Sequence, residues 1–153
     1  MKQAVQTIYQ HSQRVAAKHG DRFPYIIQVA QLFREVAEEM MAHMQKEEMI
    51  LFPRIRQLEE LIANHEADKK GNVFYILAPM NVMEEEHEHA GNLLAEIRRL
   101  TNDYTPPADA CTTFRITLAE LKEFEEDLHK HVHLENNILF PLAENLLRSV
   151  ELT

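Results

Sequence analysis

Two eleven-residue stretches of this chain place the same polar residues among the same apolar ones. Residues 43–53 read HMQKEEMILFP and residues 131–141 read HVHLENNILFP, so a histidine, a glutamate four residues later and a final ILFP recur in one register. In a helix, residues i and i+4 lie about 40° apart around the axis and share a face. Each stretch therefore brings an imidazole and a carboxylate onto one helix face. The pairs are His43 with Glu47, and His131 with Glu135.

The apolar neighbours of these pairs indicate that both point into the interior. Burying an ionised carboxylate without a partner costs several kcal/mol, whereas a whole domain has only about 5 to 15 kcal/mol of net stability. No lysine or arginine falls on the same faces to compensate Glu47 or Glu135. A pair of divalent or trivalent cations would do so, with each glutamate bridging both metals and histidines completing the coordination. Imidazole and carboxylate without thiolate suit iron or manganese, and zinc less well.

Four helical stretches can position these residues. Scarce glycine (three in all) and long runs without helix breakers favour an all-α fold, an up-and-down antiparallel four-helix bundle. We expect Gly20 to form a left-handed cap after the first stretch, and Pro53 and Pro141 to bend or end the second and fourth. The predicted stretches are 2–19, then 25–52 with a continuation to 63, a third from Pro79 to a turn at 101–109, and 110–147, with a polar connector at 64–72.

The helical repeat sorts the nine histidines by the residues that share their faces. Four are predicted to point inward: His19, His43, His87 and His131. Five are predicted to lie on polar faces or in solvent: His11, His65, His89, His129 and His133. The same repeat places Ile50 and Ile138 on the inward faces, one turn after the glutamates. Glu39 and Asp127 lie one turn before His43 and His131. They are expected either to hydrogen-bond ligand imidazoles or bound solvent, or to lie solvated on the flanks of their helices.

Two other interpretations were weighed against a metal site. A metal-free core is the simpler one, because a lone inward histidine is more often a hydrogen-bonded core residue than a ligand. A ferritin-like site needs E-x-x-H on two helices and a glutamate from each of the others. Glu84 with His87 and Glu126 with His129 fit that spacing, but His129 falls on a polar face and the first helix has no carboxylate before Asp21. Two copies of one pattern, with inward histidines on the other helices, favour the metal site.

Composition excludes several classes of partner. The formal net charge of −9, with lysine and arginine scattered along the chain, argues against a nucleic-acid surface and against anionic membranes. No apolar run approaches the roughly 20 residues that span a bilayer. One cysteine, Cys111, cannot form an intrachain disulfide, and the first residues have no apolar leader, so we expect a soluble cytoplasmic protein. Cys111 itself is expected to pack or to begin a helix, with no redox role.

The stretches HMQKEEMILFP, MEEEHEHAG and HVHLENNILFP, together with KHGD, resemble the hemerythrin-like domain of the di-iron proteins that repair iron-sulfur clusters. The resemblance covers nearly the whole chain, so residues 1–153 are expected to form a single domain. It implies a four-helix bundle that holds two non-haem iron ions. An incomplete pair, or substitution by manganese or zinc, is left open. The implied bridging ligands are Glu47 and Glu135, and the implied histidine ligands are His19, His43, His87 and His131.

Two departures from that family concern the amino-terminal side. The family usually has another ligand histidine about one helix length before the HGD motif, a position that here falls before Met1. It also usually carries a short amino-terminal domain with a cysteine pair, which this chain lacks. His11 is in the wrong register to replace the missing ligand. We therefore expect either that the sequence is a truncated product or fragment of a longer protein, or that the natural protein holds one iron with an incomplete set of protein ligands.

The resemblance implies a protein that helps to restore iron-sulfur clusters damaged by oxidative or nitrosative stress, as an iron donor, with damaged iron-sulfur proteins as its partners. One alternative is a sensor or carrier that binds oxygen or nitric oxide reversibly. Another is an enzyme that reduces nitric oxide or peroxide at the di-iron centre. A homodimer through the exposed end of the first helix is left open.

Overall fold

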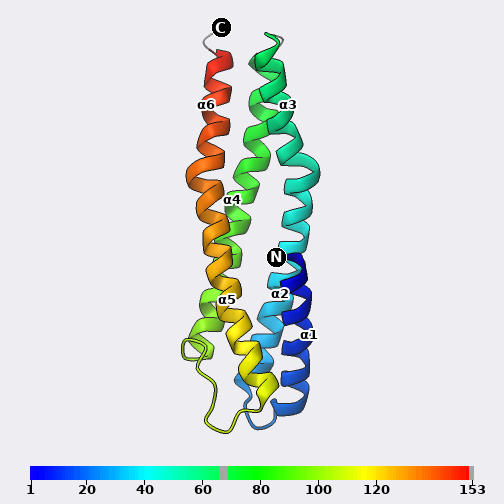
Figure 1. Cartoon of the computed structure of the whole chain (residues 1–153), viewed down its shortest axis with the longest axis vertical. Coiled ribbons are helices and arrows are strands. Elements are labelled where there is room, and N and C mark those ends of the chain that lie inside the picture. The colour runs from blue at the N-terminus through cyan, green and yellow to red at the C-terminus, as the bar shows by residue number, and fades with distance from the viewer. Residues whose placement is uncertain (66–68, 152–153) are drawn as a thin grey trace. The chain divides into compact units, whose positions relative to one another are not determined.

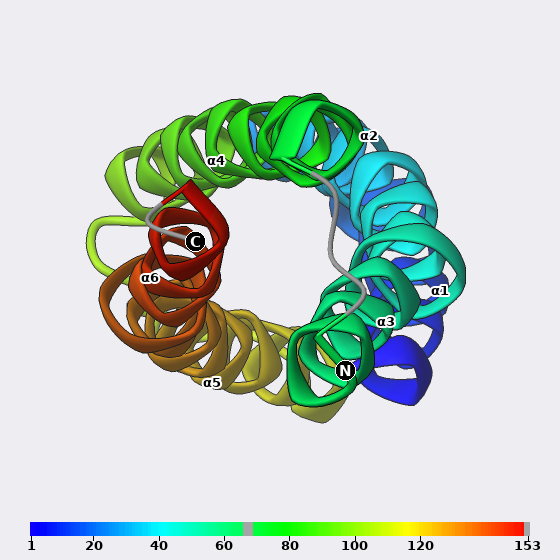
Figure 2. The same ribbon diagram turned by 90° about the horizontal axis from the view of Figure 1, so that it is seen from above.

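The computed structural model describes residues 1–65 and 69–151, and every element in those ranges is helical (Figures 1 and 2). Within these ranges there are four helical runs, two of which contain a short π-helix. The elements are α1 (Lys2–His19), α2 (Tyr25–Lys46), η1 (Glu47–Leu51), α3 (Phe52–Ala63), α4 (Lys69–Leu100), α5 (Thr112–Leu134), η2 (Glu135–Leu139) and α6 (Phe140–Glu151). This confirms the predicted all-α class with four long helices.

The chain divides into two compact units. The first unit comprises Met1–Met41 and Glu88–Lys130, and the second comprises Ala42–His87 and His131–Thr153. Among the described residues, no helix has both the length and the apolar character that crossing a membrane requires.

The first unit contains four helical segments that alternate in direction. His11 contacts Glu120 while His19 contacts Cys111, so α1 and α5 run antiparallel. Edge-to-face packing of aromatic rings joins α2 to α5 in the core. The buried core residues of this unit include Val5, Ile8, Val15, Val29, Phe33, Val36, Met40, Ala90, Leu94, Ile97, Leu121, Phe124 and Leu128. These are the positions that the 3.6-residue repeat predicts, so burial of the apolar faces accounts for the arrangement.

The second unit is built from three helical runs. They are the end of α2 continued through η1 into α3, the first part of α4, and the end of α5 continued through η2 into α6. Their apolar faces meet in one cluster: Leu51, Ile55, Leu58, Ile76, Met80, Met83, Phe140, Ala143, Leu147 and Val150. This cluster lies on the carboxyl-terminal side of the two repeated glutamates, so it forms an apolar floor beside them.

The π-helices shift the helical register after each repeated glutamate. In both, the backbone N–H of a phenylalanine donates to the carbonyl five residues earlier, from Phe52 to Glu47 and from Phe140 to Glu135. A π turn inserts about one extra residue into an α-helix, which rotates the side chains that follow it. Pro53 and Pro141 fall in the first turns of α3 and α6, where a missing N–H costs little.

The predicted inward positions of Ile50 and Ile138 are wrong for this reason. Ile50 is 39% exposed and Ile138 is 49% exposed, whereas Leu51, one residue after Ile50, is 1% exposed. A prediction made for an uninterrupted α-helix assigns the apolar face one residue too early.

The predicted start of the third helix after Pro79 is also wrong. α4 begins at Lys69, so Pro79 lies inside it and the last residues of the predicted connector at 64–72 are helical. Proline has no N–H to donate to the carbonyl four residues earlier, which here belongs to Tyr75. Arg54 of α3 donates to that carbonyl instead, with a distance of 2.9 Å, and its guanidinium stacks on the Tyr75 ring. The freed carbonyl is therefore satisfied and the helix continues.

Gly20 does not adopt the predicted left-handed conformation. Its φ and ψ are −62° and −32°, in the right-handed helical region. A Cβ at this position would overlap the carbonyl oxygen of Ala16 and would lie 2.7 Å from Cγ1 of Ile27. Glycine is therefore explained by the close packing of α1 against the start of α2. A positive φ is not the reason.

Candidate metal centre

Five of the predicted ligands come together in the second unit. His43, Glu47, His87, His131 and Glu135 each offer a ligand atom, and these atoms all lie within 4.8 Å of one another. Within each repeat the imidazole meets its own carboxylate, with Nε2 to Oε1 distances of 2.6 Å for His43 and Glu47 and 2.7 Å for His131 and Glu135. His87 of α4 lies between the repeats, 2.9 Å from Oε2 of Glu135. The two copies of the pattern thus form one cluster.

The cluster is buried but its polar atoms are not satisfied by the protein. The exposed fractions of His43, Glu47, His87 and Glu135 are 0%, 2%, 3% and 4%. Oε1 of Glu47, Nε2 of His131 and both carboxylate oxygens of Glu135 have no aligned hydrogen-bond partner. These atoms are close to one another without the alignment that hydrogen bonding needs. Such groups are costly to bury, and a cation that they coordinate would satisfy them together.

Charge coupling within the cluster is strong. Burial raises the pKa of Glu47, but contacts with His131, His43 and His87 outweigh it and hold that pKa well below its usual range. Burial lowers the pKa of His87, but Glu135 and Glu47 outweigh it and raise the value to about 9. Glu135 and then Glu47 raise the pKa of His131 to about 10, against the effect of its burial. In the absence of metal, protons therefore take the place of cations between the carboxylates.

Two polar residues that the sequence analysis did not assign orient the imidazoles. Glu86 accepts a hydrogen bond from Nδ1 of His43 at 2.8 Å and also contacts Nζ of Lys46 at 2.5 Å. Oδ1 of Asn136 lies 3.2 Å from Nδ1 of His87. A donor at Nδ1 leaves Nε2 free to coordinate a metal, which is the usual arrangement of ligand histidines. Their position in the sequence could have indicated this role, because each residue is next to a predicted ligand.

The two glutamates and His87 are positioned by different local features. Glu47 and Glu135 are the first residues of η1 and η2. π-Helical turns inside α-helices are frequently found at functional sites. The ring of His87 stacks on Phe140 at 6.3 Å with an interplanar angle of 8°, which anchors this imidazole on the apolar floor.

His19, the sixth predicted ligand, is not a member of this group of five. It belongs to the first unit, where its Nε2 lies 3.1 Å from Sγ of Cys111. Its role as a metal ligand stays a prediction that this contact does not support.

Glu39 and Asp127 also belong to the first unit. Glu39, which is partly buried, contacts Nε2 of His89 at 3.1 Å, and the exposed Glu35 contacts the same nitrogen at 3.3 Å. Asp127 is exposed. Their predicted contacts with ligand imidazoles stay predictions, while Glu86 and Asn136 are the residues seen in that position.

The remaining histidines mostly lie where the helical repeat predicts. His65, His89, His129 and His133 are exposed. His11 differs, because it is partly buried and its Nδ1 lies 2.9 Å from Oε2 of Glu120 on α5. His11 lies at the edge between the buried and exposed faces of α1. A side chain there faces the neighbouring helix, where His11 contacts the Glu120 carboxylate.

Comparison with known proteins supports the metal reading. Residues 1–143 match the family described as "Hemerythrin HHE cation binding domain". A probable iron-sulfur cluster repair protein of Haemophilus influenzae is 40% identical over 134 residues, which are 88% of this chain and 54% of that protein. The iron-sulfur cluster repair protein YtfE of Enterobacter sp. (strain 638) is 39% identical over 130 residues, 85% of this chain and 53% of its own length.

A third relative, the iron-sulfur cluster repair protein YtfE of Escherichia coli O81, is 44% identical over 106 residues, 69% of this chain and 42% of its own length. The chain thus spans about half the length of the relatives that it matches.

Proposed function

This chain belongs to the family of hemerythrin HHE cation-binding domains, and from that premise we propose that its cluster holds two non-haem irons and acts in the repair of damaged iron-sulfur clusters. The proposed ligands are His43, Glu47, His87, His131 and Glu135. The role proposed for the domain is that of an iron donor under oxidative or nitrosative stress. The relatives named as iron-sulfur cluster repair proteins support this role.

The observation that carries the proposal is the set of buried oxygen and nitrogen atoms without aligned partners at Glu47, His131 and Glu135. Carboxylates and imidazoles without thiolate suit iron. Iron bound here would supply a redox-active Lewis acid with room for exogenous ligands. The residues of the chain hold it: Glu86 and Asn136 keep the Nδ1 atoms of His43 and His87 engaged, so that Nε2 points into the cluster.

The five side chains leave coordination positions open. Two carboxylates and three imidazoles provide about seven donor atoms, whereas two octahedral irons have about twelve coordination positions. Solvent, exogenous ligands or further protein ligands can take the others. Positions that are open to exchange suit the donation of iron.

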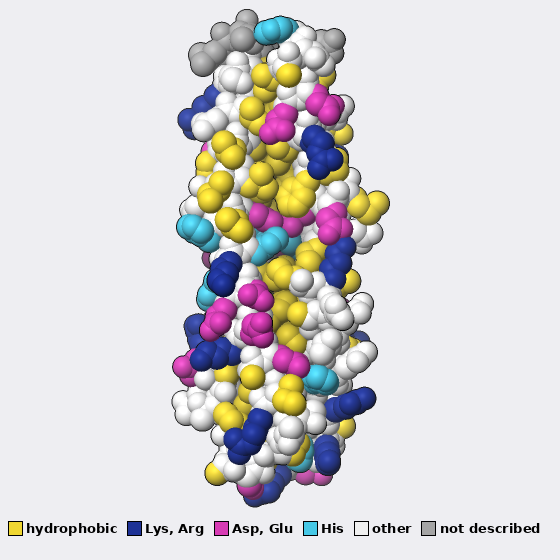
Figure 3. All heavy atoms as spheres, viewed as in Figure 1, with side chains coloured by type: hydrophobic (Ala, Val, Ile, Leu, Met, Phe, Trp, Pro, Cys, Tyr) yellow, Lys and Arg dark blue, Asp and Glu magenta, His cyan; other side chains and the backbone are white. Residues whose placement is uncertain are grey.

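One side of the cluster is accessible. The side chain of His131 is 25% exposed, whereas those of the other four ligands are almost fully buried. On the face drawn in Figure 3, histidine and acidic side chains reach the surface among hydrophobic ones. We propose that iron leaves on the His131 side.

The test is transfer of iron to a client. The chain is loaded with iron without oxygen and mixed with a nitrosylated iron-sulfur enzyme, whose recovery of activity is followed. We expect the parent to restore activity and the His43→Ala and Glu135→Ala variants to lose that ability. Equal restoration by the variants contradicts the donor role.

Matched controls are His133→Ala and Glu126→Ala, which remove exposed side chains of the same types from α5. They should restore the client as the parent does. Iron content, measured on each sample before mixing, separates loss of metal from loss of transfer.

A further inference from the structure

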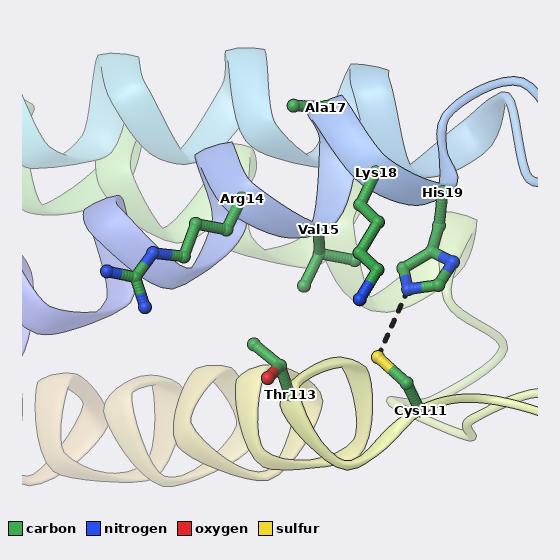
Figure 4. Close-up of a pocket in the computed structure, with 7 residues that line it drawn as sticks. All are labelled: Arg14, Val15, Ala17, Lys18, His19, Cys111 and Thr113. Carbon is green, nitrogen blue, oxygen red and sulfur yellow. Dashed lines mark hydrogen bonds between the residues drawn. The ribbon is translucent and has the colours of Figure 1, made fainter.

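The lone cysteine of this chain is paired with a histidine from another helix. Cys111 directly precedes α5, as expected for a residue that begins a helix, and its Sγ lies 3.1 Å from Nε2 of His19 at the end of α1. Figure 4 shows the imidazole pointing at the sulfur across the space between the two segments. Both residues are partly exposed, so small molecules can reach them. The imidazole of His19 is thus a proton acceptor close to the thiol, as is found for nucleophilic cysteines.

A second contact favours negative charge on the same sulfur. The backbone N–H of Phe114 points at Sγ from 3.4 Å, so Cys111 caps the amino terminus of the 23-residue helix α5. The positive end of the helix dipole stabilises an anion in this position. The ring of Phe114 also packs against His19, with centroids 6.0 Å apart, which holds the imidazole beside the thiol.

The pair opens into a hollow with basic residues. The hollow has a volume of about 430 Å³ and is lined by Arg14, Lys18, His19 and Cys111 among others. Figure 4 shows Lys18 reaching from α1 towards the segment that carries Cys111. This volume falls in the range of small-molecule sites. Two cations thus line the same hollow as the thiol, on a chain whose net charge is −9.

We infer that Cys111 is a reactive thiol that forms a mixed disulfide with a small acidic disulfide, and that His19 serves as its proton acceptor. Sγ attacks one sulfur of the disulfide, so a new S–S bond forms while the old one breaks. The departing thiolate takes the electron pair and then the proton that Nε2 of His19 took from Cys111. Cys111 is oxidised, the small disulfide is reduced, and one half of it leaves as a thiol. Arg14 and Lys18 hold the carboxylates of the bound half.

The chain allows an unambiguous measurement because it has only one cysteine. The full chain is mixed with glutathione disulfide, and the adduct is followed by intact-protein mass spectrometry. The same chain unfolded in urea gives the rate of an ordinary thiol. We expect the folded chain to react at least about tenfold faster. A folded rate equal to or below the unfolded rate overturns the inference.

His19→Gln should bring the folded rate close to the unfolded one, whereas His133→Gln, at an exposed histidine, should leave it unchanged. If His19→Gln reacts as fast as the parent, His19 is not the proton acceptor and the inference fails. Circular dichroism of each variant shows whether it is folded.

The charge of the disulfide gives a test that does not depend on the His19 variant. Relative to the unfolded chain, the folded parent should react several-fold faster with glutathione disulfide than with cystamine, a cationic disulfide. Lys18→Gln should lose most of this preference, whereas Arg34→Gln, which removes the same charge outside the hollow, should keep it. Absence of the preference in the parent contradicts the acidic ligand. Metal binding is not involved in any of these readouts.

Discussion

His43 and His87 face each other inside the second unit, with their Nε2 atoms 3.1 Å apart. One imidazole must donate and the other accept if they are to share a hydrogen bond. A cation coordinated by both needs neither proton. Because Glu47 and Glu135 stabilise protonated imidazoles in this cluster, binding of metal there must release protons. The pair therefore couples metal affinity to pH.

The metal-free protein should lose stability in alkaline solution. The pKa values of His87 and His131 are raised from 6.5 to about 9 and about 10 by Glu135 and Glu47. Groups with a raised pKa stabilise the folded state fully below their unfolded value and lose that effect as pH rises through the folded value. The urea midpoint of chelator-treated protein should therefore fall from pH 6.5 to pH 10. A midpoint that stays level or rises would contradict the coupling of these imidazoles to the carboxylates.

Glu86→Gln should weaken metal binding without abolishing it. The carboxylate accepts from Nδ1 of His43, and loss of such a partner typically lowers metal affinity about 10-fold to 100-fold. Competition with a chelator of known affinity measures the change. Glu85→Gln removes an exposed neighbouring carboxylate and should leave affinity unchanged. Similar effects of the two variants would argue against the orienting role of Glu86.

The shift caused by η1 predicts opposite sensitivities for adjacent residues. Leu51→Ala should lower the free energy of unfolding by about 2 to 5 kcal/mol, because Leu51 is buried in the apolar cluster of the second unit. Ile50→Ala should cost less than about 1 kcal/mol, since Ile50 is 39% exposed. Urea denaturation of the metal-free variants decides between this register and that of an uninterrupted α-helix, which predicts the reverse order.

Gly20 and Gly91 should respond differently to substitution by alanine. Gly20→Ala should lower the free energy of unfolding by about 1 to 3 kcal/mol, because the new Cβ meets the Ala16 carbonyl and the Ile27 side chain. Gly91→Ala should raise it by about 0.5 to 1 kcal/mol, since Gly91 is inside α4 and an added Cβ would meet no atom within 4 Å. Thermal unfolding of both variants is the measurement. A stable Gly20→Ala protein would disprove the packing role of this glycine.

Much of this molecule follows from the helical repeat. The apolar faces and the inward positions of His43, His87 and His131 were predictable because they depend on residues within one or two turns. The convergence of Glu47 with Glu135 was predictable from the repeat of one pattern on two helices. The repeated pattern also implied the pairing of two helices, since two buried carboxylates require a shared partner.

The missed features depend on contacts between helices. Arg54 allows Pro79 to remain inside α4, and no local pattern links residues so far apart. Likewise, the close approach of Ile27, which leaves no room for a Cβ at position 20, explains why that residue is glycine. The π-helices are a different case, because their extra residue changes the period on which the prediction relied.

The most direct test of the metal centre is iron content per chain, measured together with Mössbauer spectra on protein expressed in iron-supplemented medium and purified without oxygen. We predict about two irons per chain in nitrogen- and oxygen-ligated, magnetically coupled sites, and loss of both in Glu47→Ala. One iron would contradict the di-iron assignment. Protein that remains free of iron, with Glu47 and Glu135 buried as described, would contradict the claim that this cluster binds metal.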